Sequence, residues 1–214
     1  MKTFEKLLSF LKAPYQADTY SNIKINDFIF LLLITILVVV PYALILKWAG
    51  MDQFDNIMME LLEKNKWLLA IIAIFLAPVI EEPIFRLHLD LKKSSIWWGL
   101  GLSLLMISGV WYPVALIWGY LIFLYIMISK GQKPNLKIVV YCSSALFALV
   151  HMTNFTEFDY GKYFYLVPFL VAAQFVVGLV LSYIRLNHGM KWAIIFHGVY
   201  NAVLIIPAVY FYEP

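Results

Sequence analysis

Long apolar runs, separated by short polar segments, constrain this chain more than any other feature of its sequence. The runs lie near residues 27–47, 67–89, 95–110, 112–129, 138–153, 164–184 and 190–212. About 20 apolar residues in a helix, at about 1.5 Å each, cross the roughly 30 Å hydrocarbon core of a bilayer. Backbone polar groups in lipid must be paired within the spanning structure, which favours helices. The sequence therefore predicts an all-α, polytopic transmembrane helix bundle of about seven spans.

The composition leaves little room for a separate soluble domain. Of the 214 residues, 63% are hydrophobic and only 14% are charged, against roughly 25% charged in soluble domains. We expect a short segment, 1–26, followed by a single transmembrane domain, 27–214. The net charge of +3, without a basic block, gives no indication of nucleic-acid binding. The single cysteine, Cys142, excludes an intramolecular disulfide and is interpreted as a core residue.

Two amphipathic patterns lie outside the predicted spans. Phe4, Leu7, Leu8 and Leu11 recur at helical spacing among lysines, which predicts a helix that lies on an anionic cytoplasmic surface or packs on the protein itself. Residues 54–62 have a similar pattern, which predicts an interfacial helix, with a lid over a lateral opening as the alternative. No removable signal peptide is expected at the N-terminus.

Basic residues are distributed unevenly between the two sets of connections. With the N-terminus inside, the inner segments carry Lys2, Lys6, Lys12, Lys24, Lys92, Lys93, Lys130, Lys133, Lys137, Arg185 and Lys191. The outer segments carry Lys47, Lys64, Lys66 and Lys162. Because Lys and Arg favour the cytoplasmic side, this bias predicts a cytoplasmic N-terminus, an outer C-terminus and an odd number of spans. We expect a multi-pass protein of the plasma membrane.

Three clusters of polar residues interrupt the apolar runs, at residues 81–86, 147–151 and 197–201. An ionisable side chain near the bilayer centre costs about 2.5–3.5 kcal/mol on insertion scales. Such groups are therefore expected to face one another inside the bundle, and the three clusters together predict a site.

The first cluster contains two carboxylates and one guanidinium. Glu82 and Arg86 are four residues apart and share a helix face, where they can neutralise each other. Glu81 is left over and is a candidate general base. Pro78 and Pro83 lack backbone donors, so they free carbonyls one turn upstream and are expected to bend the helix. The alternative is a purely structural ion pair with Glu81 hydrogen-bonded nearby.

The second and third clusters are weaker indications by themselves. Phe147 and His151 lie one turn apart, and a single histidine on an apolar helix is usually an interhelical hydrogen-bonding group. His197 and Asn201 also lie one turn apart, so both can point at a common oxygen. That pairing suits an oxyanion hole, and it suits ordinary helix packing equally well.

Taken in order, the motifs EExxxR, FxxxH and HxxxN resemble those of the CAAX protease and bacteriocin-processing (Abi) family of intramembrane endopeptidases, and the chain is similar to type II CAAX prenyl endopeptidases. The stretch 178–201 also resembles the last two helices of the family, including the turn at Gly189. The motif-bearing core would be 67–212. An additional hairpin, 95–129, makes the interval between the first two motifs longer than in typical members.

The resemblance implies hydrolysis of a peptide bond in a membrane-associated peptide or protein terminus, in CAAX-type or bacteriocin-type processing. It implies that Glu81 activates water with help from His151, while His197 and Asn201 stabilise the oxyanion. It implies supporting roles for Glu82, Arg86 and Phe147. The substrate would be reached through the lipid bilayer.

Two questions stay open at the level of the sequence. Family members have been classed both as metalloproteases and as metal-independent glutamate proteases. Zinc could be held by Glu81 or Glu82 with His151 and His197, but no HExxH pair is present, and we favour the metal-free mechanism. The alternative to an enzyme is a non-catalytic immunity or scaffold protein, or a small proton-coupled transporter that uses the same ionisable residues.

Overall fold

The computed structural model describes residues 2–107 and 111–212, and these residues form a bundle of helices with no strand. The α-helices are α1 (Lys2–Lys12), α2 (Ile25–Trp48), α3 (Ile57–Ile71), α4 (Ala77–Arg86), α5 (Lys93–Ser103), α6 (Tyr112–Ser129), α7 (Leu136–Val150), α8 (Tyr160–Tyr163), α9 (Val167–Leu170), α10 (Ala172–His188) and α11 (Met190–Phe211). The 3-10 helices are η1 (Met51–Gln53), η3 (Leu87–Asp90), η4 (Leu104–Met106), η5 (His151–Asn154) and η6 (Phe164–Leu166), and a π-helical turn, η2 (Ile72–Leu76), joins α3 to α4. The predicted all-α class is confirmed.

The described residues contain five helical stretches that are long and apolar enough to cross a membrane. These are α2, the stretch Ile57–Asp90, α6, the stretch Leu136–Asn154, and α11. A sixth is obtained if Tyr160–Leu170 and α10, which meet at an angle of 41°, form one broken span. This number is close to the predicted seven. The difference lies at the predicted span 95–110, where α5 has only 11 residues and positions 108–110 lie outside the described part.

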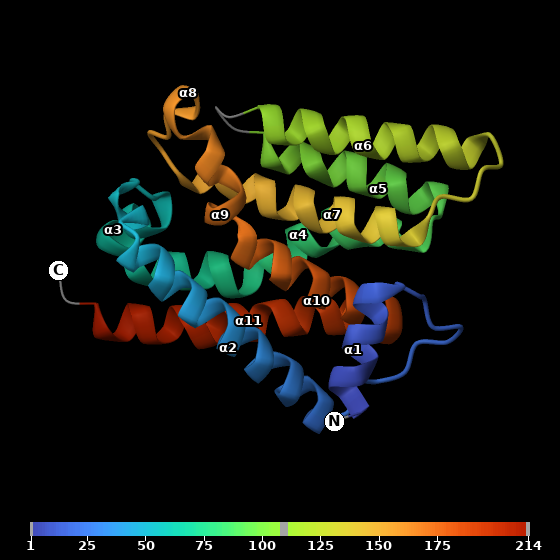
Figure 1. The fold of residues 1–214 in the computed structure, drawn as a ribbon, viewed down its shortest axis with the longest axis horizontal. Helices are drawn as coiled ribbons and strands as arrows, with labels where there is room; N and C mark the ends of the chain where they lie inside the picture. The colour runs from blue at the N-terminus through green and yellow to red at the C-terminus, as the bar shows by residue number, and fades with distance from the viewer. Residues whose placement is uncertain (1, 108–110, 213–214) are drawn as a thin grey trace.

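The helices run back and forth along the long axis of the bundle. In Figure 1, α1 and the connection between α6 and α7 lie near one end, whereas α3, α8 and the C-terminus lie near the other. The predicted hairpin corresponds to α5 and α6, which pack side by side and against α4 and α7 respectively. Tyr120 of α6 fixes the hairpin, because its hydroxyl contacts Nε2 of His88 at 3.1 Å and donates to the carbonyl of Val139 at 3.2 Å.

The amphipathic N-terminal helix is present and packs its apolar face on the bundle. Leu7 and Phe10 of α1 are buried, and the Phe10 ring lies 5.3 Å from the ring of Tyr183 in α10. Phe4 and Leu8 are each 40% exposed. Of the two predicted arrangements, the structure therefore shows α1 packed on the protein. Phe4 and Leu8 are the apolar side chains that remain available for contact with lipid.

Residues 13–24, which we call the N-terminal strap, cross the end of the bundle after α1. The strap is held by hydrogen bonds from Ala17 N–H to the Leu186 carbonyl, from His188 Nδ1 to the Ser21 carbonyl, and from Trp192 Nε1 to Asn22 Oδ1. Its Tyr20 ring lies against Gly189, whose φ of 93° is a conformation that favours glycine. The strap therefore ties the start of the chain to the turn between α10 and α11.

At the opposite end, two connections pack on each other. The helix predicted at 54–62 begins at Ile57, where the Asn56 side chain caps it, and it is interrupted by a non-helical Asn65. Phe54 contacts the rings of Phe155, Phe158 and Tyr163. This aromatic cluster joins the segment before α3 to the segment after α7.

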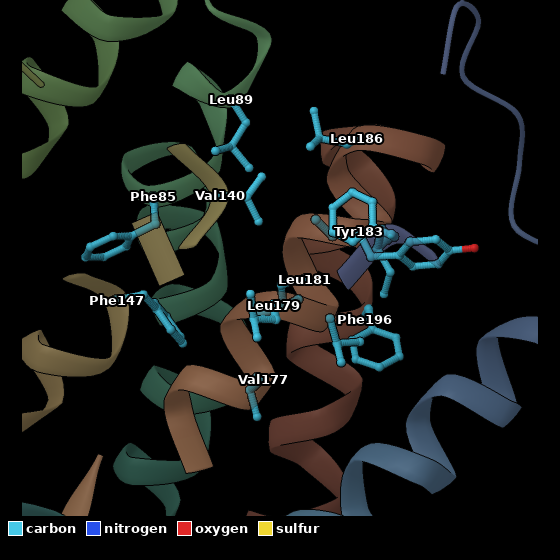
Figure 2. Close-up of a cluster of buried hydrophobic side chains, with 14 of the residues drawn as sticks. Phe85, Leu89, Val140, Phe147, Val177, Leu179, Leu181, Tyr183, Leu186 and Phe196 are labelled. Carbon is cyan, nitrogen blue, oxygen red and sulfur yellow. The ribbon is translucent and has the colours of Figure 1, made fainter. Parts of the chain in front are cut away.

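Small residues bring the motif-bearing helices together in the centre. A Cβ on Gly178 of α10 would lie only 3.1 Å from Cβ of Ser144 in α7, so glycine is needed for this close contact. Figure 2 shows Phe85 of α4 beside Phe147 of α7, and their ring centroids are 5.4 Å apart. Cys142, predicted as a core residue, is instead partly exposed, because α7 turns Ser143 and Ser144 into the bundle.

Candidate active site

The first motif lies on α4 and is buried in the middle of the bundle. Nη1 of Arg86 lies 3.4 Å from Oε1 of Glu82, and both side chains are fully buried. The guanidinium carbon of Arg86 also lies 4.0 Å from the centroid of the Phe147 ring, over its face. The ion pair expected from the i, i+4 spacing is therefore present, and the second motif covers its guanidinium.

The second motif lies where α7 ends. His151 is the first residue of η5, and its Nδ1 lies 2.7 Å from the carbonyl oxygen of Phe147. A carbonyl oxygen can only accept, so Nδ1 carries the hydrogen and Nε2 is left with a free lone pair. The Phe147 ring stands edge-on to both histidines, 4.7 Å from the His151 ring and 5.9 Å from the His197 ring. This geometry leaves Nε2 as the nitrogen of His151 that can accept a hydrogen bond.

The third motif brings an imidazole between the two carboxylates. Nδ1 of His197 in α11 lies 2.9 Å from Oε1 of Glu82, and its Nε2 lies 3.9 Å from Oε2 of Glu81. Because the same Glu82 oxygen pairs with Arg86, we assign Glu82 as the acceptor and His197 Nδ1 as the donor. The sequence predicted that these residues would meet but did not predict that His197 bridges both glutamates.

Asn201 lies one turn beyond His197 and has a different partner. Its Nδ2 donates to the carbonyl oxygen of Ala73, at the π-helical turn η2, over a distance of 2.7 Å. Within the protein, His197 and Asn201 therefore have separate partners, and their predicted role at a common substrate oxygen stays a prediction. An amide nitrogen has two hydrogens, so one N–H of Asn201 stays available.

Two glycines that the sequence analysis did not assign to the site allow this packing. A Cβ on Gly198 would lie 2.9 Å from the carbonyl oxygen of Ile74, and a Cβ on Gly178 would lie 3.3 Å from Nη2 of Arg86. Gly198 directly follows His197 inside the third motif, and this position was the feature of the sequence that could have indicated its role in the site. A Cβ at Gly198 would force α11 away from the backbone of η2, whereas one at Gly178 would require a smaller shift of its neighbours.

The three residues considered as zinc ligands do not form a metal site in this geometry. Glu81, His151 and His197 all lie in the described part of the chain, and no group of three His, Cys, Asp or Glu side chains there is arranged to hold a metal ion. Nδ1 of each histidine already donates to a protein oxygen. Zinc-ligating histidines usually donate their other ring N–H to a carboxylate or a backbone carbonyl in this way, so the hydrogen bonds leave Nε2 of both histidines for a ligand, and the choice between a metal and a metal-free mechanism stays a prediction.

The fold and this cluster together define a polytopic membrane protein with a buried carboxylate and imidazole site. A comparison with models of known protein families agrees with this class of protein. The model of the family described as "Type II CAAX prenyl endopeptidase Rce1-like" matches residues 63–203. The matched region is about two thirds of the chain and contains all three motifs. The chain therefore belongs to this family of intramembrane endopeptidases, and the predicted resemblance is confirmed. No curated protein and no solved structure gave a match.

Proposed function

We propose that this protein hydrolyses a peptide bond of a membrane-associated peptide or protein terminus, with Glu81 as the general base for an attacking water. His151 assists Glu81, while His197 and Asn201 stabilise the oxyanion. Glu82, Arg86 and Phe147 hold these groups in place. Membership of an endopeptidase family supports the reaction class, and the geometry of the cluster supports the division of roles.

The observation that carries the proposal is the difference between the two adjacent glutamates. The Glu82 side chain is completely buried, whereas the Glu81 side chain keeps 19% of its surface exposed. Glu82 contacts both Arg86 and His197, so it is occupied as a structural acceptor. Glu81 lies 3.9 Å from Nε2 of His197 and keeps exposed surface, and a general base must be within reach of the water that it deprotonates.

The histidines can then take different parts in the reaction. His151 presents an unprotonated Nε2 because its Nδ1–H is donated to the Phe147 carbonyl, which suits it to accept a hydrogen bond from the attacking water. His197, held at Nδ1 by Glu82, can as an imidazolium direct Nε2–H at developing negative charge. Preorganised donors of this kind typically contribute about 10²–10³ in rate each.

The proposed step conserves atoms and charge. Glu81 accepts a proton from water as the water oxygen forms a bond with the scissile carbonyl carbon. The carbonyl oxygen becomes an oxyanion that accepts from His197 Nε2–H and from the second N–H of Asn201. The C–N bond then breaks, and the proton on Glu81 passes to the leaving nitrogen. A carboxylic acid and an amine result, and Glu81 is again ionised. Transfer of the acid proton to the amine then gives a carboxylate and an ammonium group.

We propose that the reaction takes place in the plasma membrane, with α1 and the strap on the cytoplasmic side. The excess of Lys and Arg on the segments at that end supports this orientation. The apolar outer surfaces of the spans make the lipid bilayer the medium through which a peptide substrate arrives.

The test compares membranes from the native host carrying the wild-type chain with membranes carrying Glu81→Ala. All new peptide termini are sequenced by mass spectrometry, so no substrate needs to be guessed. Glu63→Ala is the matched control, because Glu63 is an exposed glutamate on the same span, Ile57–Asp90. Protein levels are equalised by immunoblot.

Termini that appear with wild type and Glu63→Ala but not with Glu81→Ala are the expected result, and they identify the substrate and the cleaved side. Identical sets of termini in all three membranes at equal protein levels would overturn the proposal. That outcome would favour the non-catalytic immunity, scaffold or transport role.

A further inference from the structure

A backbone irregularity next to the site leaves one carbonyl without a partner inside its own helix. In η2 the N–H of Ala77 bonds to the carbonyl of Ile72, five residues earlier, instead of the carbonyl of Ala73 four residues earlier. The next residue that could donate to Ala73 in this π-helical register is residue 78, which is a proline and has no N–H. The π-helical turn and Pro78 together therefore free the Ala73 carbonyl.

The freed carbonyl is used by a residue of the site. Nδ2 of Asn201 donates to it at 2.7 Å, across 128 positions of sequence. The contact is possible because α11 approaches η2 closely at Gly198, where any Cβ would lie 2.9 Å from the Ile74 carbonyl. Pro78 is itself buried, so an unbonded carbonyl beside it would be costly without this side-chain donor.

We propose that Pro78 is a positioning residue, which fixes the Asn201 side-chain amide by keeping the Ala73 carbonyl free to accept from it. With one amide N–H committed to Ala73, the plane of the amide is set and the second N–H has a defined direction. Turns of π-helix often occur at functional sites, and here the turn supplies an acceptor that an α-helix would have used internally. This inference rests on the proposed role of Asn201 as an oxyanion donor.

The substitution that tests it is Pro78→Ala, which restores an N–H at position 78 that can compete with Asn201 for the Ala73 carbonyl. Pro78→Val is a second variant that restores the same N–H while nearly preserving side-chain volume. Pro41→Ala is the matched control, because it also restores one N–H inside a span, at an exposed position of α2.

The first readout does not depend on catalysis. In protein labelled with ¹⁵N at asparagine side chains and held in detergent micelles, the Asn201 amide signals are identified by their loss in Asn201→Ala. We expect one of the two amide protons to be protected in wild type and in Pro41→Ala, and to exchange about tenfold faster in both Pro78 variants. Unchanged protection in the Pro78 variants would overturn the positioning role, whether or not the protein is a protease.

The second readout uses the cleavage identified by sequencing of termini. We expect Pro78→Ala to lower kcat by about 10–100-fold with little change in KM, because misplacing a group by about 1 Å can cost 10²-fold. In the Asn201→Ala background the same change should alter kcat by no more than about 2-fold, since its target is gone. An equal loss in both backgrounds would show that Pro78 acts through another group and would overturn the inference.

Discussion

Two buried arginines of this bundle pair with carboxylates, and their surroundings differ. The central cluster consists of Glu81, Glu82, Arg86 and His197. The terminal cluster, near the strap, consists of Tyr20, Asp90, Ser95 and Arg185, where Nη2 of Arg185 lies 3.7 Å from Oδ2 of Asp90. The ion pair of the central cluster joins Glu82 and Arg86, which are four residues apart on one helix. The ion pair of the terminal cluster joins residues that are far apart in the sequence, and the side chains of both pairs are almost completely buried.

The terminal cluster is balanced in charge and rich in hydrogen bonds. Arg185 Nη1 donates to the Tyr20 hydroxyl at 2.6 Å. The two oxygens of Asp90 accept from the Lys92 N–H and from the Ser95 hydroxyl, both at 3.0 Å. One cation meets one anion, and both carboxylate oxygens are bonded. Such an arrangement stabilises a structure and has little capacity left for chemistry.

The central cluster has two carboxylates for one guanidinium. Oε2 of Glu82 and all three guanidinium nitrogens of Arg86 have no hydrogen-bond partner among the described residues. Its remaining cation is His197, which is charged only when protonated. The comparison indicates that a spare carboxylate and an imidazole that contacts both carboxylates, more than burial itself, distinguish the central cluster from a structural ion pair.

The strongest test of the difference between the two clusters is to neutralise one carboxylate in each. Glu81→Gln should lower cleavage by about 10³-fold or more, because general base catalysis contributes roughly 10²–10⁴-fold, while the thermal unfolding temperature in detergent stays near that of the wild type. Asp90→Asn should have the reverse effect, with cleavage retained and stability reduced. Rates are measured on the substrate found by sequencing of termini. A Glu81→Gln protein with wild-type turnover would show that the two clusters do not differ in function.

Removing each arginine comes next in expected size. Arg86→Met leaves the fully buried Glu82 with only His197 as a donor, and breaking a buried pair from one side costs about 3–5 kcal/mol. Arg185→Met should cost less, since Asp90 keeps the bonds from Lys92 and Ser95. Reversible unfolding in mixed micelles measures both.

The control for the arginine comparison is the double variant Glu82→Gln/Arg86→Met, which removes the stranded charge. It should recover part of the stability lost in Arg86→Met. If Arg185→Met proves the more destabilising of the two single changes, the terminal cluster is not the better satisfied one.

A smaller effect is expected from closing the space between α11 and η2. Gly198→Ala places a Cβ 2.9 Å from the Ile74 carbonyl, and overpacking of this kind costs about 1–3 kcal/mol. Gly119→Ala is the matched control, because no atom lies within 4 Å of its added Cβ. Thermal unfolding of the two variants side by side checks the difference, and equal midpoints would contradict the close approach of α11.

The smallest effect concerns the hydroxyl that completes the terminal cluster. Tyr20→Phe removes the acceptor of Arg185 Nη1 and should cost about 1 kcal/mol, the usual net value of one hydrogen bond. Cleavage should be unchanged, which activity and unfolding assays on the same preparation would show. A marked loss of activity would mean that the terminal cluster contributes to the site.

Much of the fold follows from the sequence because lipid restricts what a backbone can do. The apolar runs at α2, α6 and α11 predicted their helices well, since a spanning segment must pair its own polar groups. The apolar run at 95–110 correctly predicted a helix but not its length. The helix, α5, has only 11 residues, because apolar composition does not determine where a helix ends.

The site was predictable where its contacts are local. The i, i+4 spacing of Glu82 and Arg86 sufficed for their ion pair, and Pro78 indicated a freed carbonyl. The partners of His197 and Asn201 lie 115 and 128 residues away, and they depend on how closely α11 approaches α4. That approach is set by Gly198, whose role is visible only when the neighbouring backbone is in place.

The N-terminal strap also bears on the order in which the molecule can be completed. Asn22 and Trp192, which hold it in place, are 170 positions apart, and Ser21 and His188 are 167 apart. The strap is synthesised well before α10 and α11, yet the residues on which it docks belong to α10 and to the start of α11. The strap can therefore dock only when α10 and the turn to α11 are in place, which makes this contact a late step in the assembly of the bundle.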